Sequence, residues 1–132
     1  MVSTLREIVL PYGTLLARVL LAAVFLYSGQ DKLRHWKAAV SEVAEIGLPW
    51  PRLFAGATIA LQLLGGLAVL SGVGAALGAA MLAAFTIAAT LLGHRFWLLH
   101  GDRARREFTT SLEHLAIVGG LLLVILNSLQ NS

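Results

Sequence analysis

Forty-one consecutive residues, 53–93, contain no Asp, Glu, Lys, Arg or His. This segment is too long for one helix of a soluble domain and too apolar for a loop. A Ser-Gly-Val-Gly sequence at 71–74 divides it into two parts. Each part has about 20 residues, the length of helix that crosses a hydrocarbon core of roughly 30 Å. The segment therefore predicts a transmembrane helical hairpin, with spans at about 53–70 and 74–93.

The composition of the whole chain supports further spans. Hydrophobic residues make up 58% of the 132 residues and charged residues 13%, and the mean hydropathy is +0.79, which lies outside the balance of soluble domains. Apolar runs predict two more spans, at about 13–32 and 110–129. We therefore expect an all-α membrane protein, a bundle of four transmembrane helices that occupies residues 1–132 as a single domain.

Apolar residues in the segment between the first two spans recur at helical spacing. Trp36, Val40, Val43 and Ile46 are three or four residues apart, and the charged residues of the segment lie elsewhere. This pattern predicts an amphipathic helix on the membrane interface, which Gly47 ends.

The positive charges are distributed unequally between the two sides of the predicted membrane. Eight of the ten Lys and Arg residues fall in the connections between spans 1 and 2 and between spans 3 and 4. Because positively charged loops stay in the cytoplasm, we expect both basic connections to be cytoplasmic and both termini to lie outside. The net charge of +3 then reflects topology and contact with anionic lipid, and we expect no nucleic-acid partner.

Small residues recur at four-residue spacing in the central hairpin, as in Gly56/Ala60 and Gly74/Gly78. Such pairs allow two helix backbones to approach closely. Packing within the bundle is the simpler interpretation, and the contact face of a homo-oligomer is the alternative.

Polar side chains inside the spans are candidate ligand-binding residues, because they are costly in lipid unless paired or hydrated. Arg18 lies about five residues from the outer end of the first span, where it either extends to the headgroups or faces the bundle. Gln62 lies near the middle of the second span, as an interhelical hydrogen bonder or as a ligand, and within reach of Arg18 if their helices are adjacent. Tyr27 and Ser28 lie near the inner end of the first span, and Ser28 has the alternative of bonding a carbonyl of its own helix.

A second polar group is expected at the cytoplasmic end, where Lys32, His94, Glu113 and His114 reach a similar depth. Lys32 and Glu113 could form a bridge between helices. Haem or a metal held between the two histidines is an alternative that we do not expect, because imidazoles at a membrane boundary usually serve as hydrogen bonders. The chain contains no cysteine and no metal-binding motif.

Four segments, in order along residues 14–126, resemble the DoxX family of small four-helix bacterial membrane proteins. They share the family's early arginine and SG-x-x-K-L ending of the first helix, its second-helix pattern, its third-helix exit and its final helix. The segments are Arg18 to Leu33, Gln62 to Gly66 followed by Gly72, His94 to Trp97, and Leu112 to Leu123. The chain departs from the family pattern at Gln62, where the family often has Glu, and at His114, where it often has Asn.

The resemblance implies an accessory protein or subunit of the bacterial inner membrane, quinone-associated within an oxidoreductase or a thiol-redox or detoxification complex, with a soluble or membrane redox partner. Arg18 and Gln62 would then donate hydrogen bonds to a quinone carbonyl. Phe25, Tyr27, Phe85 and the Gly65/Gly66 gap would form the walls of the slot. Catalysis by this chain alone is not expected, because it has no nucleophile–base set. A non-catalytic scaffold for a soluble enzyme and a small-solute transporter are the alternatives.

Overall fold

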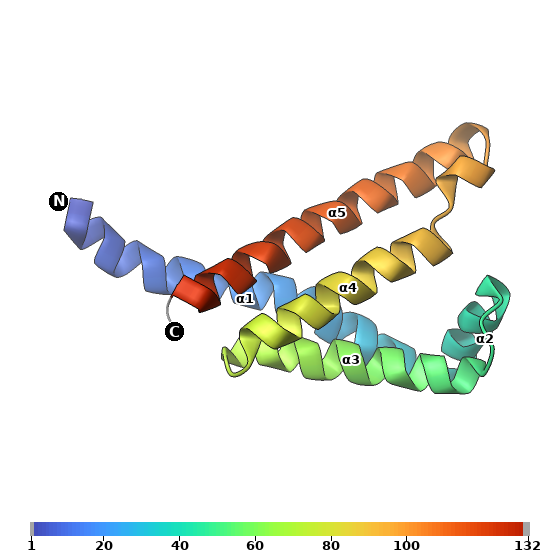
Figure 1. The fold of residues 1–132 in the computed structure, drawn as a ribbon, viewed down its shortest axis with the longest axis horizontal. Coiled ribbons are helices and arrows are strands. Elements are labelled where there is room, and N and C mark those ends of the chain that lie inside the picture. The colour runs from blue at the N-terminus through green and yellow to red at the C-terminus, as the bar shows by residue number, and fades with distance from the viewer. Residues whose placement is uncertain (1, 131–132) are drawn as a thin grey trace.

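A computed structural model describes residues 2–130 of the chain and, for Phe96, only the backbone. These residues form long helices joined by short connections (Figure 1), and four of the helices are long and apolar enough to cross a membrane. The predicted all-α membrane bundle is confirmed. The elements in chain order are α1 Val2–Arg34, α2 Trp36–Ile46, α3 Pro51–Ser71, α4 Ala75–Gly93, a short 3-10 helix η1 Phe96–Leu98, and α5 Gly101–Gln130.

The central hairpin has nearly the predicted boundaries, because glycine and proline mark its ends. α3 begins at Pro51, which has no backbone N–H. In the first turn of a helix the N–H groups have no partner within the helix, so the proline costs no hydrogen bond there. The helix ends at Gly72, whose positive φ of 85° closes the last turn through a hydrogen bond to Ala68. Gly74, also at positive φ, then precedes the first residue of α4. Each of these conformations suits glycine because it has no Cβ.

The two outer helices begin earlier than the sequence predicted. α1 starts at Val2 rather than near residue 13 and continues through Pro11, which removes only one backbone hydrogen bond. Its first turns project beyond the other helices (Figure 1). α5 starts at Gly101 rather than near residue 110, so the charged segment 102–107, which was expected to be a loop, is helical. Its Arg, Ala and Glu residues favour helix, and Asp102 is well placed near the positive end of the helix dipole.

The amphipathic helix between the first two spans is confirmed as α2. It ends at Gly47, whose φ of 95° makes it the left-handed cap that the sequence predicted. Trp36, Val40 and Val43 are half-buried, whereas the charged Lys37 and Glu42 are exposed. The apolar face therefore packs against the bundle, and α2 contacts both α1 and α3.

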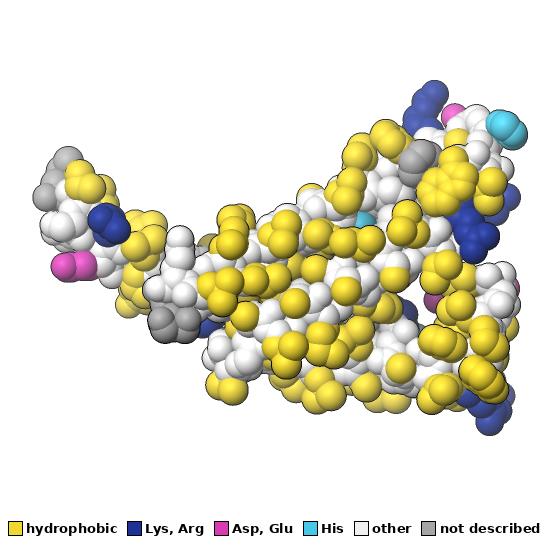
Figure 2. Space-filling view, in the orientation of Figure 1, with side chains coloured by type: hydrophobic (Ala, Val, Ile, Leu, Met, Phe, Trp, Pro, Cys, Tyr) yellow, Lys and Arg dark blue, Asp and Glu magenta, His cyan; other side chains and the backbone are white. Residues whose placement is uncertain are grey.

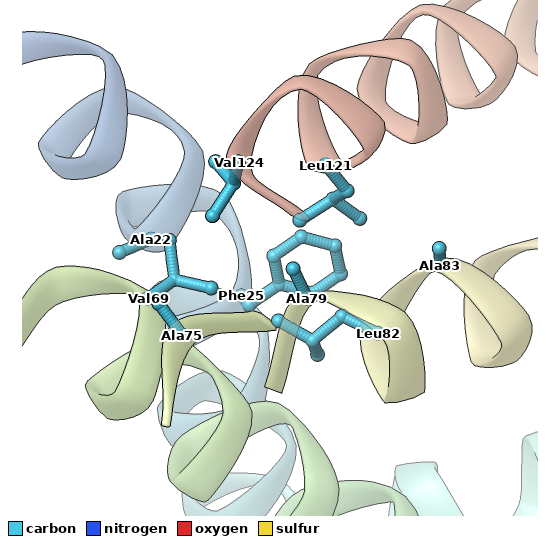
Figure 3. Packing of buried hydrophobic residues seen from close by; sticks show 9 residues of the cluster. All are labelled: Ala22, Phe25, Val69, Ala75, Ala79, Leu82, Ala83, Leu121 and Val124. Carbon is cyan, nitrogen blue, oxygen red and sulfur yellow. The ribbon is translucent and has the colours of Figure 1, made fainter. Parts of the chain in front are cut away.

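The hydrophobic core lies in the half of the bundle that contains the α3–α4 turn, and all four long helices contribute to it (Figure 3). Leu82, Leu121 and Val69 are its largest fully buried side chains. Small residues let the helices approach closely there. A Cβ at Gly78 would lie 2.7 Å from the Cβ of Ala68, so the expected close packing of the central hairpin is present within the bundle.

The two ends of the molecule differ in charge. Lys and Arg side chains gather at the end formed by α2 and the α4–α5 connection (Figure 2), and we call this the basic end. The opposite end, with the α3–α4 turn, the start of α1 and the end of α5 (Figure 1), is called the turn end. Most large apolar side chains outside the core are exposed along the helices, as expected for surfaces that contact lipid.

Candidate functional site

The helices leave a cavity of about 970 Å³ in the half of the bundle that faces the basic end. Side chains from α1, α2, α3, α4 and α5 line it, so no single helix forms the site. Its walls combine apolar residues with polar and charged ones. The polar and charged lining residues are Ser28, Lys32, Glu42, Glu45, Thr58, Gln62, Thr86, His94, Arg95, Arg103, Glu107 and His114.

Gln62 is the most deeply buried amide of the cavity wall. Only 5% of the residue is exposed, and its Oε1 atom has no hydrogen-bond partner in the described part of the chain. A buried polar atom without a partner costs about 1–3 kcal/mol. The predicted ordinary role of Gln62, as a hydrogen bonder between helices, therefore does not account for Oε1. Because this oxygen is itself buried, the amide must rotate toward the cavity before a ligand there can donate a hydrogen bond to it.

Contacts between helices fix the depth of Gln62. Gly65, one turn away on α3, packs against Leu82 of α4. Thr86, one turn from Leu82 in the same direction, therefore lies level with Gln62, and both residues line the cavity. Thr90 is one further turn toward the basic end.

Arg18 lies away from this cavity. One of its guanidinium nitrogens, Nη1, would stand 2.6 Å from a Cβ built on Gly72, which places the guanidinium at the turn end. Gly72 and Gln62 are ten residues apart on one helix, or about 15 Å at 1.5 Å per residue. α1 and α3 are neighbours, as the pairing required, but the structure does not bring Arg18 and Gln62 together.

The expected walls of the slot are present in part. Phe25, Phe85 and Ser28 line the cavity. Tyr27 does not, because 69% of the residue is exposed on the outside of α1. The Gly65/Gly66 gap is filled, since Leu82 packs on Gly65 and Leu26 on Gly66.

The polar group expected at the basic end is assembled, but with a different acid. His94, Lys32 and His114 line the cavity together, whereas Glu113 is exposed. The expected bridge between Lys32 and Glu113 is not among the ion pairs of residues 2–130. The carboxylate that pairs with His94 through Nδ1 is that of Glu107.

The sequence contained a signal for Glu107 that was obscured when its segment was expected to be a loop. In a helix, residues seven apart lie on the same face, two turns from one another. Glu107 and His114 have this spacing. Because α5 begins at Gly101, the two side chains share one face of this helix, and both line the cavity.

The two histidines are held by hydrogen bonds and by each other. Their rings meet edge to face, with centroids 5.1 Å apart and planes at 74°. Thr90 Oγ1 lies 2.8 Å from Nδ1 of His114 and donates its hydrogen to the carbonyl of Thr86 at 2.6 Å.

Among the described residues, no group of three or more metal-ligating side chains is arranged to hold a metal ion.

The arrangement can bind a molecule that has an apolar body and a polar head. Gln62 offers an acceptor and two N–H donors at the deep end, and each imidazole offers a donor or an acceptor. The charged side chains Lys32, Arg95 and Glu107 lie toward the basic end, where they can remain hydrated.

Residues 13–95 match the family model described as DoxX. This matched region contains α3, α4 and most of α1, and therefore Gln62. Inner membrane protein YphA of Escherichia coli (strain K12) is 23% identical over 114 residues, which cover 86% of this chain and 81% of YphA. No solved structure shows significant similarity to the chain.

Proposed function

The chain belongs to the DoxX family, and on this premise we propose that it is a quinone-binding accessory protein or subunit of an oxidoreductase complex in the bacterial inner membrane. One observation carries the proposal. Gln62 is buried in the wall of a large cavity, and its Oε1 atom has no partner in the described part of the chain. The similarity to an inner membrane protein supports the location.

The chemistry of a quinone fits this cavity. Ligand sites for such molecules need an apolar slot and a few well-placed polar contacts. Phe25 and Phe85 supply apolar walls around Gln62. A quinone carbonyl accepts a hydrogen bond and the hydroxyl of its reduced form donates one. An amide can bond both forms, because its N–H groups donate to the carbonyl and its oxygen accepts from the hydroxyl.

The electrons would come from a redox partner protein. The sequence contains no cysteine, so this chain supplies no thiol relay. We therefore propose a binding role for the chain and place the electron donor or acceptor on a soluble or membrane partner.

A binding titration with the purified protein in lipid nanodiscs tests the proposal. The wild type should bind a short-chain ubiquinone, and Gln62→Leu should weaken binding about threefold to tenfold, which corresponds to the net value of one hydrogen bond. Gln30→Leu is the matched control, because Gln30 is exposed on α1 and its replacement should leave affinity unchanged.

Two results would contradict the proposal: no saturable quinone binding by the wild type, or equal affinities for Gln62→Leu and the wild type. Loss of folding does not confuse the comparison. Gln62→Leu removes an unpaired buried polar atom, so we expect its melting temperature to equal or exceed that of the wild type.

We also propose that the basic end faces the cytoplasm and that α1 begins and α5 ends outside it. The concentration of Lys and Arg at the basic end supports this orientation. Because the sequence has no cysteine, single cysteines can be introduced at the exposed positions Ser3 and Arg105. In spheroplasts, a membrane-impermeant maleimide should label the first variant and not the second, and the reverse pattern would invert the topology.

A further inference from the structure

His114 lines the same cavity as Gln62 and lies slightly nearer the basic end. Thr90, its hydrogen-bond partner, is one turn beyond Thr86, which is level with Gln62. His114 and Gln62 therefore differ in depth by about one helical turn, or roughly 5 Å. They come from different helices, α5 and α3, and both line the same cavity.

The hydrogen bonds around His114 define which of its ring nitrogens is free to bond a ligand. The carbonyl of Thr86 can only accept, so the single hydroxyl hydrogen of Thr90 is donated to it. Thr90 Oγ1 must then accept from an N–H at Nδ1 of His114. In the neutral imidazole, Nε2 consequently carries a lone pair and no hydrogen.

His94 differs from His114 in its hydrogen-bond partner and in its depth in the cavity. Its Nδ1 is paired with the Glu107 carboxylate, and it follows the last residue of α4, so it lies nearer the basic end than Thr90. Both partners of this pair are about one-third exposed, with 31% of each side chain accessible. His114 is the imidazole that lies closer to the depth of Gln62.

We propose that His114 is a second ligand of the quinone headgroup and that binding of the oxidised headgroup takes up one proton on this imidazole. The proposal rests on the quinone-binding function proposed above. A quinone carbonyl has no hydrogen to give, so the lone pair of Nε2 cannot bond it. When Nε2 takes a proton from water, it gains an N–H that donates to the carbonyl oxygen. The hydroxyl of the reduced form instead donates to the neutral imidazole, so the reduced form requires no proton uptake.

The charge on His114 is set among several other charged groups. Those that line the same cavity come from α1, α2, α5 and the segment after α4, whereas α3 contributes no titratable side chain to its wall, and Glu113 precedes His114 on α5. The groups are Lys32 of α1, Glu42 and Glu45 of α2, His94 and Arg95 after α4, and Arg103, Glu107 and Glu113 of α5. Because groups of both signs are present, the pH dependence of binding alone does not identify the group that takes up the proton. Variants of single residues are needed to assign the proton uptake to His114.

The test is the pH dependence of binding by the full chain in nanodiscs, with a short-chain ubiquinone and its quinol as separate probes. Histidine is the side chain that ordinarily changes charge between pH 5 and 8. Wild-type affinity for the quinone should weaken about fivefold to tenfold between pH 6 and pH 8, while affinity for the quinol should not weaken over this range. A flat quinone profile for the wild type would overturn the inference.

Two variants of His114 assign the effect. His114→Asn supplies an amide N–H that does not titrate, so quinone binding should persist with a flat pH profile. His114→Leu should bind the quinone at least threefold more weakly at pH 6, provided that its melting curve shows a folded protein. His100→Asn is the matched control at an exposed histidine of the α4–α5 connection and should keep the wild-type profile.

Other outcomes separate this inference from the proposed function. If the wild type binds no quinone, the proposed function fails and the inference fails with it. If the wild type binds quinone with Gln62-dependent affinity but His114→Asn keeps the wild-type pH profile, only the inference fails. A profile that becomes flat in His94→Gln and is unchanged in His114→Asn would also overturn it, because the linked proton would then belong to His94.

Discussion

Replacing Gly78 by alanine tests the packing that holds α3 and α4 together. The added Cβ would lie 2.7 Å from the Cβ of Ala68, 3.2 Å from the carbonyl oxygen of Gly65 and 3.6 Å from its Cα. Ordinary carbon contacts are at about 3.5–4.0 Å. A methyl group on a helix cannot rotate away, so the two helices must separate by about 1 Å at this point, next to fully buried Leu82.

The cost of this separation can be estimated against a matched glycine. Overpacking of a filled core costs about 1–3 kcal/mol, and exchanging glycine for alanine in a helix stabilises it by up to about 1 kcal/mol. Gly119 of α5 has nothing within 4 Å of its added Cβ, so Gly119→Ala carries only the helix-propensity term. The difference between the two variants should therefore be the packing cost, about 1–3 kcal/mol.

Equilibrium unfolding in mixed micelles, with increasing sodium dodecyl sulfate and helicity followed by circular dichroism, measures this difference. Gly78→Ala should unfold at a lower detergent fraction than Gly119→Ala. Equal midpoints for the two variants would refute the close approach of α3 and α4 at Gly78.

Three further predictions follow from the same structure. Leu82→Ala should destabilise the protein by about 2 kcal/mol in the same unfolding assay, at the low end of the usual range because lipid removes the hydrophobic part of the loss. An unfolding midpoint equal to that of the wild type would contradict the buried position of Leu82. Arg18→Leu should change quinone affinity less than twofold, because the guanidinium lies at Gly72, and a larger loss would place Arg18 in the site. Glu107→Gln should lower stability by less than about 1 kcal/mol, because its pairing with His94 is about one-third exposed and screened by water, and a greater loss would show that the pair is more enclosed.

The parts of the fold that the sequence predicted well are those whose ends carry local signals. Pro51 and Gly72 fix the ends of α3 by backbone geometry, and the predicted boundaries lie within two residues of the observed ones. The starts of α1 and α5 were missed for a different reason. Hydropathy marks where a helix enters lipid, whereas the helix itself continues through Pro11 and through the charged residues after Gly101.

The site was predictable at the level of single residues more than of pairs. The apolar neighbours of Gln62 in the sequence indicated that it lies deep in the bundle, and only 5% of the residue is exposed. Its pairing with Arg18 depended on the register between α1 and α3, which the packing of Gly29 against Leu63 determines. A pattern within one segment contains no information on that register, so the sequence could not exclude the pair.

The acid of the polar group shows how one boundary error affects a site. With the segment before residue 110 expected to be a loop, Glu113 was the available carboxylate near His114. Because α5 begins at Gly101, Glu107 lies on the face of His114, and Glu113 is rotated about 100° away from it. The start of α5 at Gly101 therefore explains why Glu107 lies in the polar group and pairs with His94.

Photolabelling with an azido-ubiquinone, followed by mass spectrometry of the labelled peptides, tests whether the cavity around Gln62 binds a quinone. Label is expected on residues around Gln62 of α3, Ser28 of α1 and His114 of α5, which line one cavity, and excess unlabelled quinone should suppress it. Label spread over lipid-facing positions such as Leu64 and Leu123, without suppression by unlabelled quinone, would contradict the claim that this cavity is a quinone site.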